Sequence, residues 1–338
     1  MTHPPFPKAP HPSILISIPA LDEAATVGLV LESLPTSLEG ASAVAHMVVD
    51  DGSTDRTADV AEEHGAHVVR HRRNLGLGHA FNTSVGEALA LGADILVTID
   101  ADGQFDPGEI PLLVRPIVEG HADVVTGNRF HEGRRPESMP RVRYLGNLFF
   151  SKLLSTLLGE GIDDVSCGFR AYSREALLNL NLFGRQTYTQ ESLLDIVHKG
   201  LRVAEVPISV HYHKDRKSRV ARSLVRYGVN ALKIIMRTAR DFEPLRFFGA
   251  MAGAVMLLGS VLDLWLLAFW LRTGSFSPYK FVGFTGTALV VVGILIFGFA
   301  ILADMLDRLR VNQERVLYQQ RKMMFGSSKA SARGEERV

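Results

Sequence analysis

Two long apolar stretches near the end of this 338-residue chain limit its fold more than any other feature. Residues 247–271 contain one ionisable side chain, Asp263, and residues 281–303 contain none. Crossing the hydrocarbon core of a bilayer takes about 20 apolar residues, and a soluble core helix rarely stays apolar for so long. The sequence therefore predicts two transmembrane helices within residues 247–303. A hydrophobic hairpin packed inside a soluble protein is the alternative.

Basic residues flank both predicted spans on the same side. The loop between the spans, residues 272–280, is short and has two positive charges, whereas the outer flanks carry Arg237, Arg240, Arg246, Arg308, Arg310, Arg315, Arg321 and Lys322. Because positively charged flanks stay in the cytoplasm, we expect both chain ends there. The chain is thus predicted to be an integral membrane protein with its body on the cytoplasmic face and a basic cytoplasmic tail over residues 304–338.

Residues 1–12 are rich in Pro and His and lack an apolar signal-peptide core, so they are interpreted as a flexible tail. The single cysteine, Cys167, excludes a disulfide framework and a Cys-rich zinc site. We expect it to be a small buried packing residue.

Charge is distributed unevenly along the chain. Residues 1–201 contain 16 Lys and Arg against 26 Asp and Glu, whereas residues 202–246 contain 11 against 4. This distribution argues against nucleic acid as a partner and indicates an anionic surface met at one place. Residues 221–246 are predicted to form a basic amphipathic juxtamembrane helix, which could lie on an anionic leaflet or pack on the globular body.

Before the membrane region, apolar strands alternate with helices. The predicted strands are Ser13–Pro19, His46–Asp50, Val68–Val69 and Asp94–Asp100, and the predicted helices are Ala24–Leu34, Thr54–His64 (capped by Ser53 or Thr54), His79–Leu91 and Pro107–Glu119. This alternation predicts a doubly wound α/β sheet, with a catalytic domain over residues 13–220. Since ligands bind at the carboxyl ends of such strands, the acidic residues that follow each strand should surround one crevice.

The acidic residues after the fourth strand suggest how a phosphate-bearing ligand is held. A Gly-x-Gly-x-x-Gly turn does not follow the first strand, and the chain has no Walker A motif, so a dinucleotide dehydrogenase is not expected. Asp100 and Asp102, with Gln104 beside them, could instead bind a divalent cation that screens a diphosphate. The alternative is that these residues only form a turn and cap a helix.

Seven short motifs occur in an order that matches one enzyme family. They are Pro19-Ala-Leu-Asp-Glu23, Val49-Asp-Asp-Gly-Ser-Thr-Asp55, Asn74-Leu-Gly-Leu-Gly78, Asp100-Ala-Asp-Gly-Gln104, Gly127-Asn-Arg129, Asp164-Val-Ser-Cys-Gly-Phe-Arg170, and Gln190-Glu191 ahead of Glu205-Val-Pro-Ile208. Over residues 13–218 the sequence resembles family 2 glycosyltransferases of the GT-A fold, of the dolichyl-phosphate mannosyltransferase and polyprenyl-phosphate glucosyltransferase type. Two C-terminal spans also occur in that branch of the family.

The resemblance implies a role for individual residues. Nucleotide-sugar binding would involve Pro19, Ala20, Glu23, Asp51, Asp100, Gln104 and Arg219. Asp102 and Gln104 would bind Mg²⁺ or Mn²⁺, and Asp100, Asp102 and Arg129 would be catalytic. The acceptor phosphate would meet Arg129, Arg143 and Arg216, while Gly168, Arg170, Gln190 and Glu191 would shape the sugar pocket.

The implied reaction is the inverting transfer of one hexose, mannose or glucose, from a nucleotide-sugar to a polyprenyl phosphate at the cytoplasmic membrane face. A divalent cation stabilises the charge that develops on the leaving nucleotide, and an ionised phosphate acceptor needs no strong general base. The alternatives are transfer to another lipid, a processive polysaccharide synthase, or a membrane-anchored binding protein without catalysis. The sequence is also compatible with a homo-oligomer.

The chain departs from the family pattern at two places. Leu21-Asp22 stands where an aromatic residue and Asn are usual. An Arg-x-x-Gly-x-Ser-Lys segment often follows the Val-Pro-Ile strand, and here Arg216 replaces the Gly and Ser218-Arg219 takes the last two places. The basic stretch from His211 to Arg219 could gather lipid phosphate, or could reflect the positive-inside bias alone.

Overall fold

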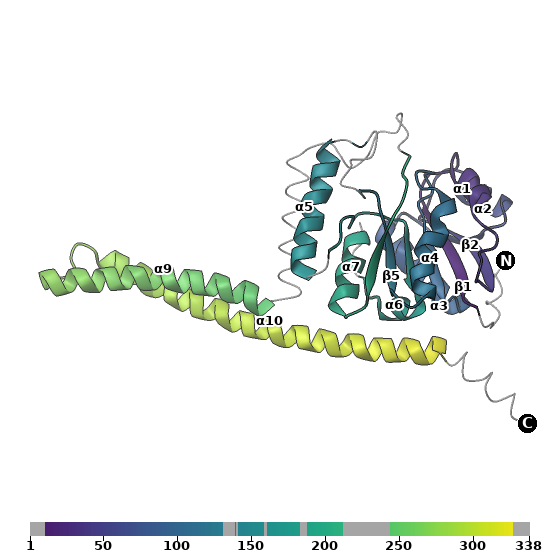
Figure 1. Ribbon diagram of the computed structural model, residues 1–338. Helices are drawn as coiled ribbons and strands as arrows, with labels where there is room; N and C mark the ends of the chain where they lie inside the picture. The colour runs from purple at the N-terminus through teal and green to yellow at the C-terminus, as the bar shows by residue number, and fades with distance from the viewer. Residues whose placement is uncertain are drawn as a thin grey trace, which may run out of the picture. The chain divides into compact units, whose positions relative to one another are not determined.

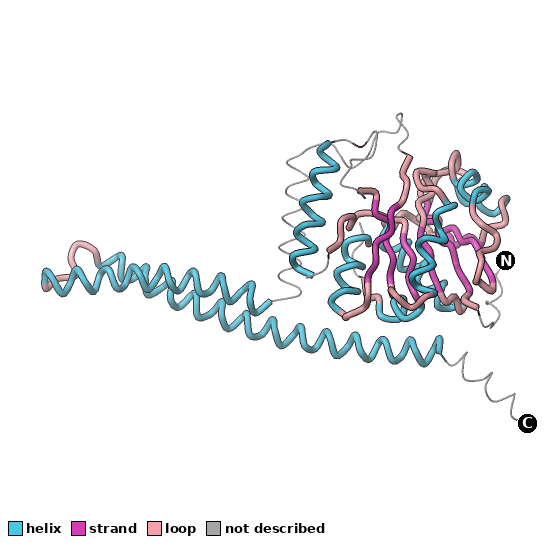
Figure 2. Tube along the Cα trace, in the orientation of Figure 1, coloured by secondary structure: helices cyan, strands magenta, loops and turns pink. Residues whose placement is uncertain are grey.

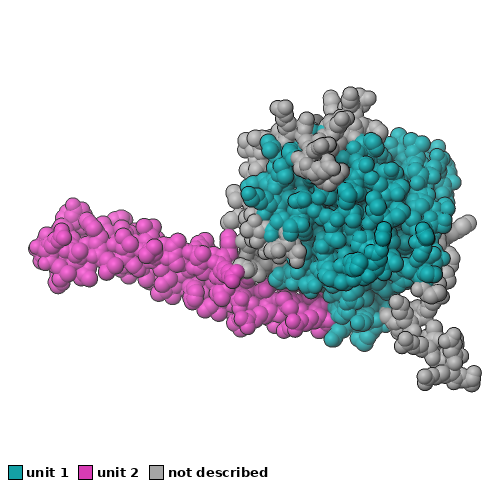
Figure 3. All heavy atoms as spheres, in the orientation of Figure 1, with its two compact units in different colours: residues 1–222, 318–338 teal, residues 223–317 magenta. Residues whose placement is uncertain are grey.

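The computed structural model describes residues 11–130, 139, 141–158, 161–182, 188–211 and 244–326. The chain divides into two compact units, Met1–Arg222 with Tyr318–Val338, and Ser223–Leu317 (Figure 3). The first unit is an α/β domain and the second is a helical hairpin. Residues 221–243 of the predicted juxtamembrane helix lie outside the described residues.

A seven-stranded sheet forms the centre of the first unit, with the order β3-β2-β1-β4-β6-β5-β7 (Figures 1 and 2). Its strands are β1 (Ser13–Ala20), β2 (Ala43–Asp50), β3 (His67–Arg70), β4 (Ile95–Thr98), β5 (Val124–Asn128), β6 (Arg170–Ser173) and β7 (Val203–Pro207). Strands β1 to β4 pair in parallel, and β6 runs antiparallel to both β4 and β5. The predicted α/β sheet is confirmed, and the reversal at β6 is a feature that the strand–helix alternation did not predict.

Helices connect the strands. They are α1 (Val27–Ser33), α2 (Thr57–Glu63), α3 (Leu77–Leu91), the short 3₁₀ helix η1 (Pro107–Glu109), α4 (Ile110–Val118), α5 (Arg141–Leu158), α6 (Arg174–Asn179) and α7 (Thr189–His198). The four helices predicted from the sequence correspond to α1, α2, α3 and η1 with α4. Their observed boundaries differ from the predicted ones by a few residues at most.

Helices cover both faces of the sheet. Successive side chains of β1 point to opposite faces, so they belong to two different buried clusters. Ile14, Ile16 and Ile18 belong to one buried cluster that also contains apolar side chains of α1 and α4. Leu15 belongs to a second cluster with side chains of α3 and α6. A buried hydrogen bond of 2.8 Å between the hydroxyls of Ser17 and Ser84 also joins β1 to α3. The uninterrupted apolar sequence of β1 is therefore explained by burial on both faces.

The predicted cap of the second helix is wrong. Helix α2 begins at Thr57 and its N-cap residue is Arg56, whose side chain makes no capping hydrogen bond, while Asp55 Oδ1 accepts the Thr57 N–H at 2.9 Å. Ser53 and Thr54 instead bond to the turn after β1: the Ser53 hydroxyl accepts the Asp22 N–H at 2.9 Å, and the Thr54 N–H donates to Asp22 Oδ1 at 2.8 Å. The side chains of Ser53 and Thr54 are therefore engaged with Asp22 in the neighbouring loop and do not cap the helix.

The second unit contains the two helices that the apolar stretches predicted. They are α9 (Pro244–Thr273) and α10 (Lys280–Gly326), and both are long and apolar enough to cross a membrane. Only 11% of the most apolar window of each helix is buried. A hairpin packed in a soluble core would have most of these side chains covered, so the exposed apolar surface favours membrane-spanning helices.

Glycine residues allow α9 and α10 to approach closely. A Cβ atom at Gly259 would stand 2.6 Å from the carbonyl oxygen of Gly286, and one at Gly293 would stand 2.2 Å from Cγ of Met256. Small residues at such crossings are typical of packed membrane helices. Asp263 lies at this contact, where its Oδ2 is 3.5 Å from the Thr287 hydroxyl. The one acid of the first span therefore faces the second helix.

The last turns of α10 belong to the first unit and pack on α6. The Arg321 guanidinium donates to the carbonyl oxygens of Leu178 (3.3 Å) and Leu180 (2.6 Å), at the C-terminal end of α6. The Tyr318 hydroxyl donates to Glu175 Oε1 at 2.7 Å. Tyr318 and Phe325 also pack against the cluster under α6. The segment interpreted as a cytoplasmic basic tail is thus helical as far as Gly326, and its end is built into the α/β domain.

Candidate active site

The carboxyl ends of β1, β2 and β4 lie at one edge of the sheet. Their parallel register pairs Ala20 with Asp50 and Ser17 with Thr98, so the turns that follow the three strands are neighbours. Each of these turns carries acidic side chains, as the sequence analysis expected.

The turn after β4 presents two half-buried aspartates. Asp102 Oδ1 accepts the Gln104 N–H at 3.1 Å, which closes the turn over residues 102–104. Phe105, which follows, is buried against the ring of Phe169 at 5.3 Å between centroids. The packed Phe105 fixes the exit of the turn, so Asp100 and Asp102 are held at the carboxyl end of a buried strand.

Gly168 lies directly against Asp100. A Cβ atom at this position would be 3.0 Å from Asp100 Oδ1 and 3.4 Å from the Tyr188 hydroxyl. The carbonyl oxygen of Gly168 accepts hydrogen bonds from the hydroxyls of Thr98 (2.8 Å) and Tyr188 (3.2 Å). The buried Tyr188 ring in turn stacks on Phe81 with centroids 4.1 Å apart. The absence of a side chain at Gly168 thus sets the room that is available to the Asp100 carboxylate.

The end of β1 and the turn that follows it contain the predicted nucleotide-binding residues: Pro19 and Ala20 close the strand, and Glu23 lies in the turn. Pro19 and Ala20 are buried, and Glu23 is half-buried. Asp22 has a positive φ of 54°, a conformation that Asp and Asn tolerate better than other non-glycine residues. The replacement of the usual Asn by Asp at this position is therefore compatible with the backbone.

Asp51, at the end of β2, is an anchor for a neighbouring loop. Its carboxylate accepts the N–H groups of Leu75 (3.0 Å) and Gly76 (2.8 Å) and lies 2.7 Å from Nδ1 of His71. Gly52 has a φ of 77°, and a Cβ atom there would lie 2.3 Å from the backbone of Arg73. Only glycine permits this close approach of the two loops. Asp51 therefore positions the Asn74–Gly78 loop, and the predicted contact with the nucleotide stays a prediction.

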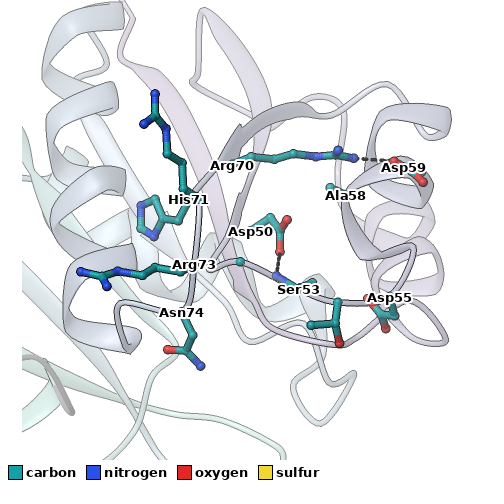
Figure 4. A pocket seen from close by; sticks show the side chains of 12 residues that line it. Asp50, Ser53, Asp55, Ala58, Asp59, Arg70, His71, Arg73 and Asn74 are labelled. Carbon is teal, nitrogen blue, oxygen red and sulfur yellow. Dashed lines mark hydrogen bonds and ion pairs between the residues drawn. The ribbon is translucent and has the colours of Figure 1, made fainter.

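A hollow of about 580 Å³ lies beside these turns (Figure 4). It is lined by residues that follow β2 and β3, namely Asp50, Gly52, Ser53, Thr54, Asp55, Ala58, Asp59, Arg70, His71, Arg72, Arg73 and Asn74. Asp50 accepts the Ser53 N–H at 3.0 Å, and Arg70 pairs with Asp59 across the hollow. Of the described residues predicted to bind nucleotide and metal, none is among its lining.

Arg129, predicted to bind the acceptor phosphate, forms a buried ion pair. Its Nε and Nη2 atoms donate to the two oxygens of Asp164 at 2.6 and 2.8 Å, and Nη2 also donates to the Ser166 hydroxyl at 2.8 Å. The side chains of Arg129 and Asp164 are 4% and 0% exposed. The bidentate geometry fixes the orientation of the guanidinium. The acceptor role of Arg129 stays a prediction.

Glu205 on β7 binds the two segments that carry Arg129 and Asp164. Its carboxylate accepts the N–H groups of Asp163 (3.0 Å) and Asp164 (2.9 Å) and the amide of Asn128 (3.2 Å). Burial raises the pKa of Glu205 above its ordinary value, and the two backbone hydrogen bonds oppose the shift. The Gly127–Arg129 motif, the Asp163–Asp164 turn and β7 are therefore joined by one carboxylate, a role that the sequence analysis did not assign.

The predicted sugar-pocket residues occupy different environments. Arg170 is fully buried, and its guanidinium donates to the Thr126 hydroxyl (3.1 Å), the Ser192 hydroxyl (3.0 Å) and the Val165 carbonyl (3.0 Å). Gln190 and Glu191 are half-buried in the first turn of α7. Arg170 thus joins β5, α7 and the segment before Gly168 through buried hydrogen bonds.

The remaining predictions fall at the limits of the described residues. Arg143 belongs to α5, but its side chain is not among those described, and Arg216 and Arg219 lie outside the described residues. His211, the first residue of the predicted basic stretch, donates its backbone N–H to the carbonyl oxygen of Gln104 at 2.8 Å. An isolated bridge also pairs Phe105 with Val210. The chain after β7 therefore reaches the turn that carries Asp102.

The carboxylates after β4 fit a divalent cation that is shared with a substrate. Among the described residues, no group of three or more His, Cys, Asp and Glu side chains could hold a metal ion without further ligands. Two carboxylates completed by phosphate oxygens form a set that Mg²⁺ and Mn²⁺ accept. Asp100 and Asp102 supply two such carboxylates from a turn fixed by packing.

The mixed α/β sheet has the fold of GT-A glycosyltransferases. The family model for glycosyl transferase family 2 matches residues 15–180, and the chain belongs to this family.

Cys167, within the matched region, is fully buried as predicted, and burial raises the pKa of its thiol to about 12.

Two proteins from Haloferax volcanii are similar to this chain in sequence. A dolichyl-phosphate hexose transferase is 34% identical over 187 residues, which cover 55% of this chain and 78% of the relative. The glycosyltransferase AglJ is 28% identical over 306 residues, which cover 89% of this chain and 96% of the relative. The second similarity extends beyond the α/β domain into the helical hairpin.

A solved structure shares the fold of the α/β domain. Glucosyl-3-phosphoglycerate synthase from Mycobacterium tuberculosis, in complex with Mn²⁺ and UDP-glucose, superposes with a TM-score of 0.52 and 28% sequence identity. The match covers 68% of this chain and 78% of the synthase. It supports the assignment of a divalent metal ion to the fold.

Proposed function

We propose that this glycosyltransferase moves one hexose, mannose or glucose, from a nucleotide-sugar to a polyprenyl phosphate at the cytoplasmic face of a membrane, with inversion at the anomeric carbon. The observation that carries the proposal is the combination, in one chain, of the Asp100–Asp102 turn with two exposed apolar helices long enough to cross a bilayer. A transferase that acts on a soluble acceptor has no need of such helices. The names of relatives that act on dolichyl phosphate support the same acceptor class.

The chemistry of the acceptor agrees with the residues of the site. A phosphate monoester is ionised at neutral pH, so the attacking oxygen carries its own negative charge and needs no side chain to remove a proton. Mg²⁺ or Mn²⁺, when bound, neutralises the charge that develops on the leaving nucleoside diphosphate. Asp100 and Asp102 orient the donor at the end of β4, and Gly168 leaves the space that Asp100 occupies.

Arginine side chains position the acceptor in this proposal. Arg143 and Arg129 meet the phosphate, and Asp164 holds the Arg129 guanidinium in one orientation through two hydrogen bonds. Fixed guanidinium groups bind phosphate oxygens in a defined direction, which aligns the attacking oxygen with the anomeric carbon.

A comparison of two acceptors tests the proposal. Purified full-length protein in detergent, supplied with Mg²⁺ or Mn²⁺ and a panel of GDP- and UDP-hexoses, should convert a short-chain polyprenyl phosphate into a lipid phosphosugar detected by mass spectrometry. The corresponding unphosphorylated alcohol should give no product. Equal consumption of both acceptors would overturn the proposal, because a hydroxyl acceptor requires a base that this scheme omits.

A matched pair of aspartate variants links the activity to the site. Asp102→Ala should abolish product formation without affecting membrane insertion. Asp106→Ala is the control, because Asp106 is exposed and its side chain accepts the Gly108 N–H at the start of η1. Unchanged turnover in Asp102→Ala contradicts the assigned role of this carboxylate.

A further inference from the structure

Tyr188 connects the turn that carries Asp100 to the helix that carries two of the predicted sugar-pocket residues. It directly precedes α7, and its backbone oxygen accepts the Ser192 N–H of the first helical turn at 2.8 Å. Its side chain is buried, and its hydroxyl donates to the Gly168 carbonyl oxygen at 3.2 Å. Gly168 in turn lies against the Asp100 carboxylate. One side chain therefore links α7 to the Asp100 turn.

Two hydroxyl groups hold Gly168 in place. Thr98, the last residue of β4, and Tyr188 both donate to its carbonyl oxygen, at 2.8 and 3.2 Å. A Cβ atom on Gly168 would stand 3.0 and 3.3 Å from the two carboxylate oxygens of Asp100 and 3.4 Å from the Tyr188 hydroxyl, so these three oxygens surround one point. The two hydrogen bonds use both lone pairs of the carbonyl, and they restrict the position that Gly168 can take against the Asp100 carboxylate.

A neighbouring tyrosine separates the role of the hydroxyl from the role of the ring. Tyr172 and Tyr188 are buried in the same cluster, and both rings contact Phe81, with centroid distances of 5.3 Å and 4.1 Å. Within the described part of the chain, the Tyr172 hydroxyl has no hydrogen-bond partner. A tyrosine ring therefore packs in this cluster without a hydrogen bond, and the bond from Tyr188 to Gly168 is a separate contribution.

The Tyr188 hydroxyl is a hydrogen-bond donor at neutral pH. Burial raises the pKa of Tyr188 well above its ordinary value, and the negative charge of Asp100 adds to the rise. The phenol therefore stays protonated, and it donates to Gly168 without bringing a second negative charge near the carboxylate.

Arg170 fixes the backbone from which the Tyr188 side chain extends. Its buried guanidinium donates to the Thr189 carbonyl oxygen at 2.5 Å and to the Ser192 hydroxyl at 3.0 Å. Because Tyr188 directly precedes Thr189, these bonds hold the start of α7 in place. Packing on Phe81 fixes the ring, so the hydroxyl is preorganised to meet Gly168.

We propose that the Tyr188 hydroxyl is a positioning group for Asp100, which it orients through the Gly168 carbonyl and couples to the start of α7, where Gln190 and Glu191 lie. The inference rests on the proposed role of Asp100 toward the nucleotide-sugar, and it is independent of the acceptor. Without the hydroxyl, Gly168 is held by one donor instead of two, and the carboxylate takes a wider range of orientations. A divalent ion shared with a nucleoside diphosphate is then bound less tightly, and the donor is aligned less often.

Three variants of the full-length protein in detergent test this proposal. Tyr188→Phe and Thr98→Val each remove one donor to the Gly168 carbonyl oxygen. Tyr172→Phe is the matched control, because it removes a buried hydroxyl that makes no hydrogen bond within the described residues. The affinity for Mn²⁺ is measured with UDP and with GDP, from the electron paramagnetic resonance signal of the free ion. Steady-state kinetics with polyprenyl phosphate give kcat and KM, and thermal melts give the stability of each variant.

The outcomes separate positioning from packing. Tyr188→Phe and Thr98→Val should each weaken Mn²⁺ binding about fivefold and lower kcat by a similar factor, as expected for the loss of one hydrogen bond, with an unchanged KM for polyprenyl phosphate. Tyr172→Phe should match wild type in both measurements. The proposal is overturned if the two tyrosine variants behave alike, or if Tyr188→Phe lowers only the stability. A difference in Mn²⁺ affinity between the tyrosine variants supports the inference even when wild type glycosylates no polyprenyl phosphate, a result that contradicts the proposed function alone.

Discussion

His71 and Asp51 join the loop after β2, the loop after β3 and helix α3 through hydrogen bonds. Nδ1 of His71 lies 2.7 Å from Asp51 Oδ1, and Nε2 lies 2.9 Å from the Thr83 hydroxyl on α3. A neutral imidazole protonated at Nδ1 donates to the carboxylate and accepts from the hydroxyl, so both contacts are satisfied together. Asp51 in turn holds the N–H groups of Leu75 and Gly76. The position of the Asn74–Gly78 loop thus depends on His71 through its contact with Asp51.

Replacing His71 should therefore weaken donor binding more than it slows the chemical step. For His71→Ala we expect KM for the nucleotide-sugar to rise by about tenfold, equivalent to roughly 1.4 kcal/mol, with kcat changed little. His71→Asn should recover part of the loss, because its amide can reach the carboxylate of Asp51. Steady-state kinetics with both variants and with the exposed-site control His121→Ala check this. A general loss of folded protein, without a change in KM of the remainder, would contradict it.

Gly168→Ala should disturb Asp100 specifically. The added Cβ atom would lie 3.0 Å from Asp100 Oδ1, which is closer than a relaxed contact, so the carboxylate must shift by a few tenths of an ångström. We expect turnover to fall by about 10–100-fold and the Mn²⁺ concentration for half-maximal activity to rise, because small displacements of catalytic groups are costly. Gly86→Ala is the control, since a Cβ atom at Gly86 meets nothing within 4 Å. Equal metal dependence in the two variants would contradict the prediction.

The Arg129–Asp164 pair allows stability and acceptor binding to be separated. Asp164→Asn leaves a buried guanidinium without its counter-charge and should lower the free energy of unfolding by about 3–5 kcal/mol. The double variant Arg129→Met with Asp164→Leu should regain most of this stability, because apolar side chains can replace a buried pair. If Arg129 binds the acceptor, the stable double variant should still show a raised KM for polyprenyl phosphate and an unchanged KM for the donor. Thermal melts and kinetics on the same preparations decide between the two roles.

Glu205 should make the stability of the domain depend on pH in a definite direction. Burial raises its pKa in the folded state above the ordinary value of 4.5, so the folded protein binds the proton more tightly than the unfolded chain. Its contribution is therefore most favourable below about pH 4.5 and is lost as the pH rises through the raised pKa. The difference in Tm between wild type and Glu205→Gln should move in favour of wild type as the pH falls from 8 to about 4.5. The exposed-site control Glu39→Gln should show no comparable trend.

The sequence predicted those features that depend on local patterns. Buried parallel strands such as β1 and β4 are continuous apolar runs, and membrane helices are longer ones, so both are visible without knowledge of their partners. The acidic residues after β2 and β4 could be placed at one edge because parallel strands share their carboxyl ends. Secondary structure and the place of the acidic residues could therefore be predicted where a single segment of the sequence determines them.

Other features depend on segments far apart in the chain and carry no local signal. The antiparallel direction of β6 is set by its pairing with β4 and β5, and the start of α2 by the contact of Ser53 and Thr54 with Asp22. The presence of an aspartate at position 51 does not reveal whether its carboxylate binds a nucleotide or, as in the structure, the backbone N–H of Gly76. Asn147 and Ser151 of α5 are buried, but their hydrogen-bond partner, the Asp163 carbonyl oxygen, lies beyond the helix.

The end of α10 offers a last prediction, because its contacts with α6 rest on a few polar groups. The Arg321 guanidinium is about half-buried between the carbonyl oxygens of Leu178 and Leu180, and burial lowers its pKa. Arg321→Ala should lower the free energy of unfolding of the α/β domain by about 1–2 kcal/mol, since these carbonyls lose a charged donor. It should also speed tryptic cleavage at Lys322, because the helix end detaches more often. Arg315→Ala, exposed on the same helix, should do neither; if both variants are cleaved at the wild-type rate, the helix end does not depend on Arg321 for its attachment.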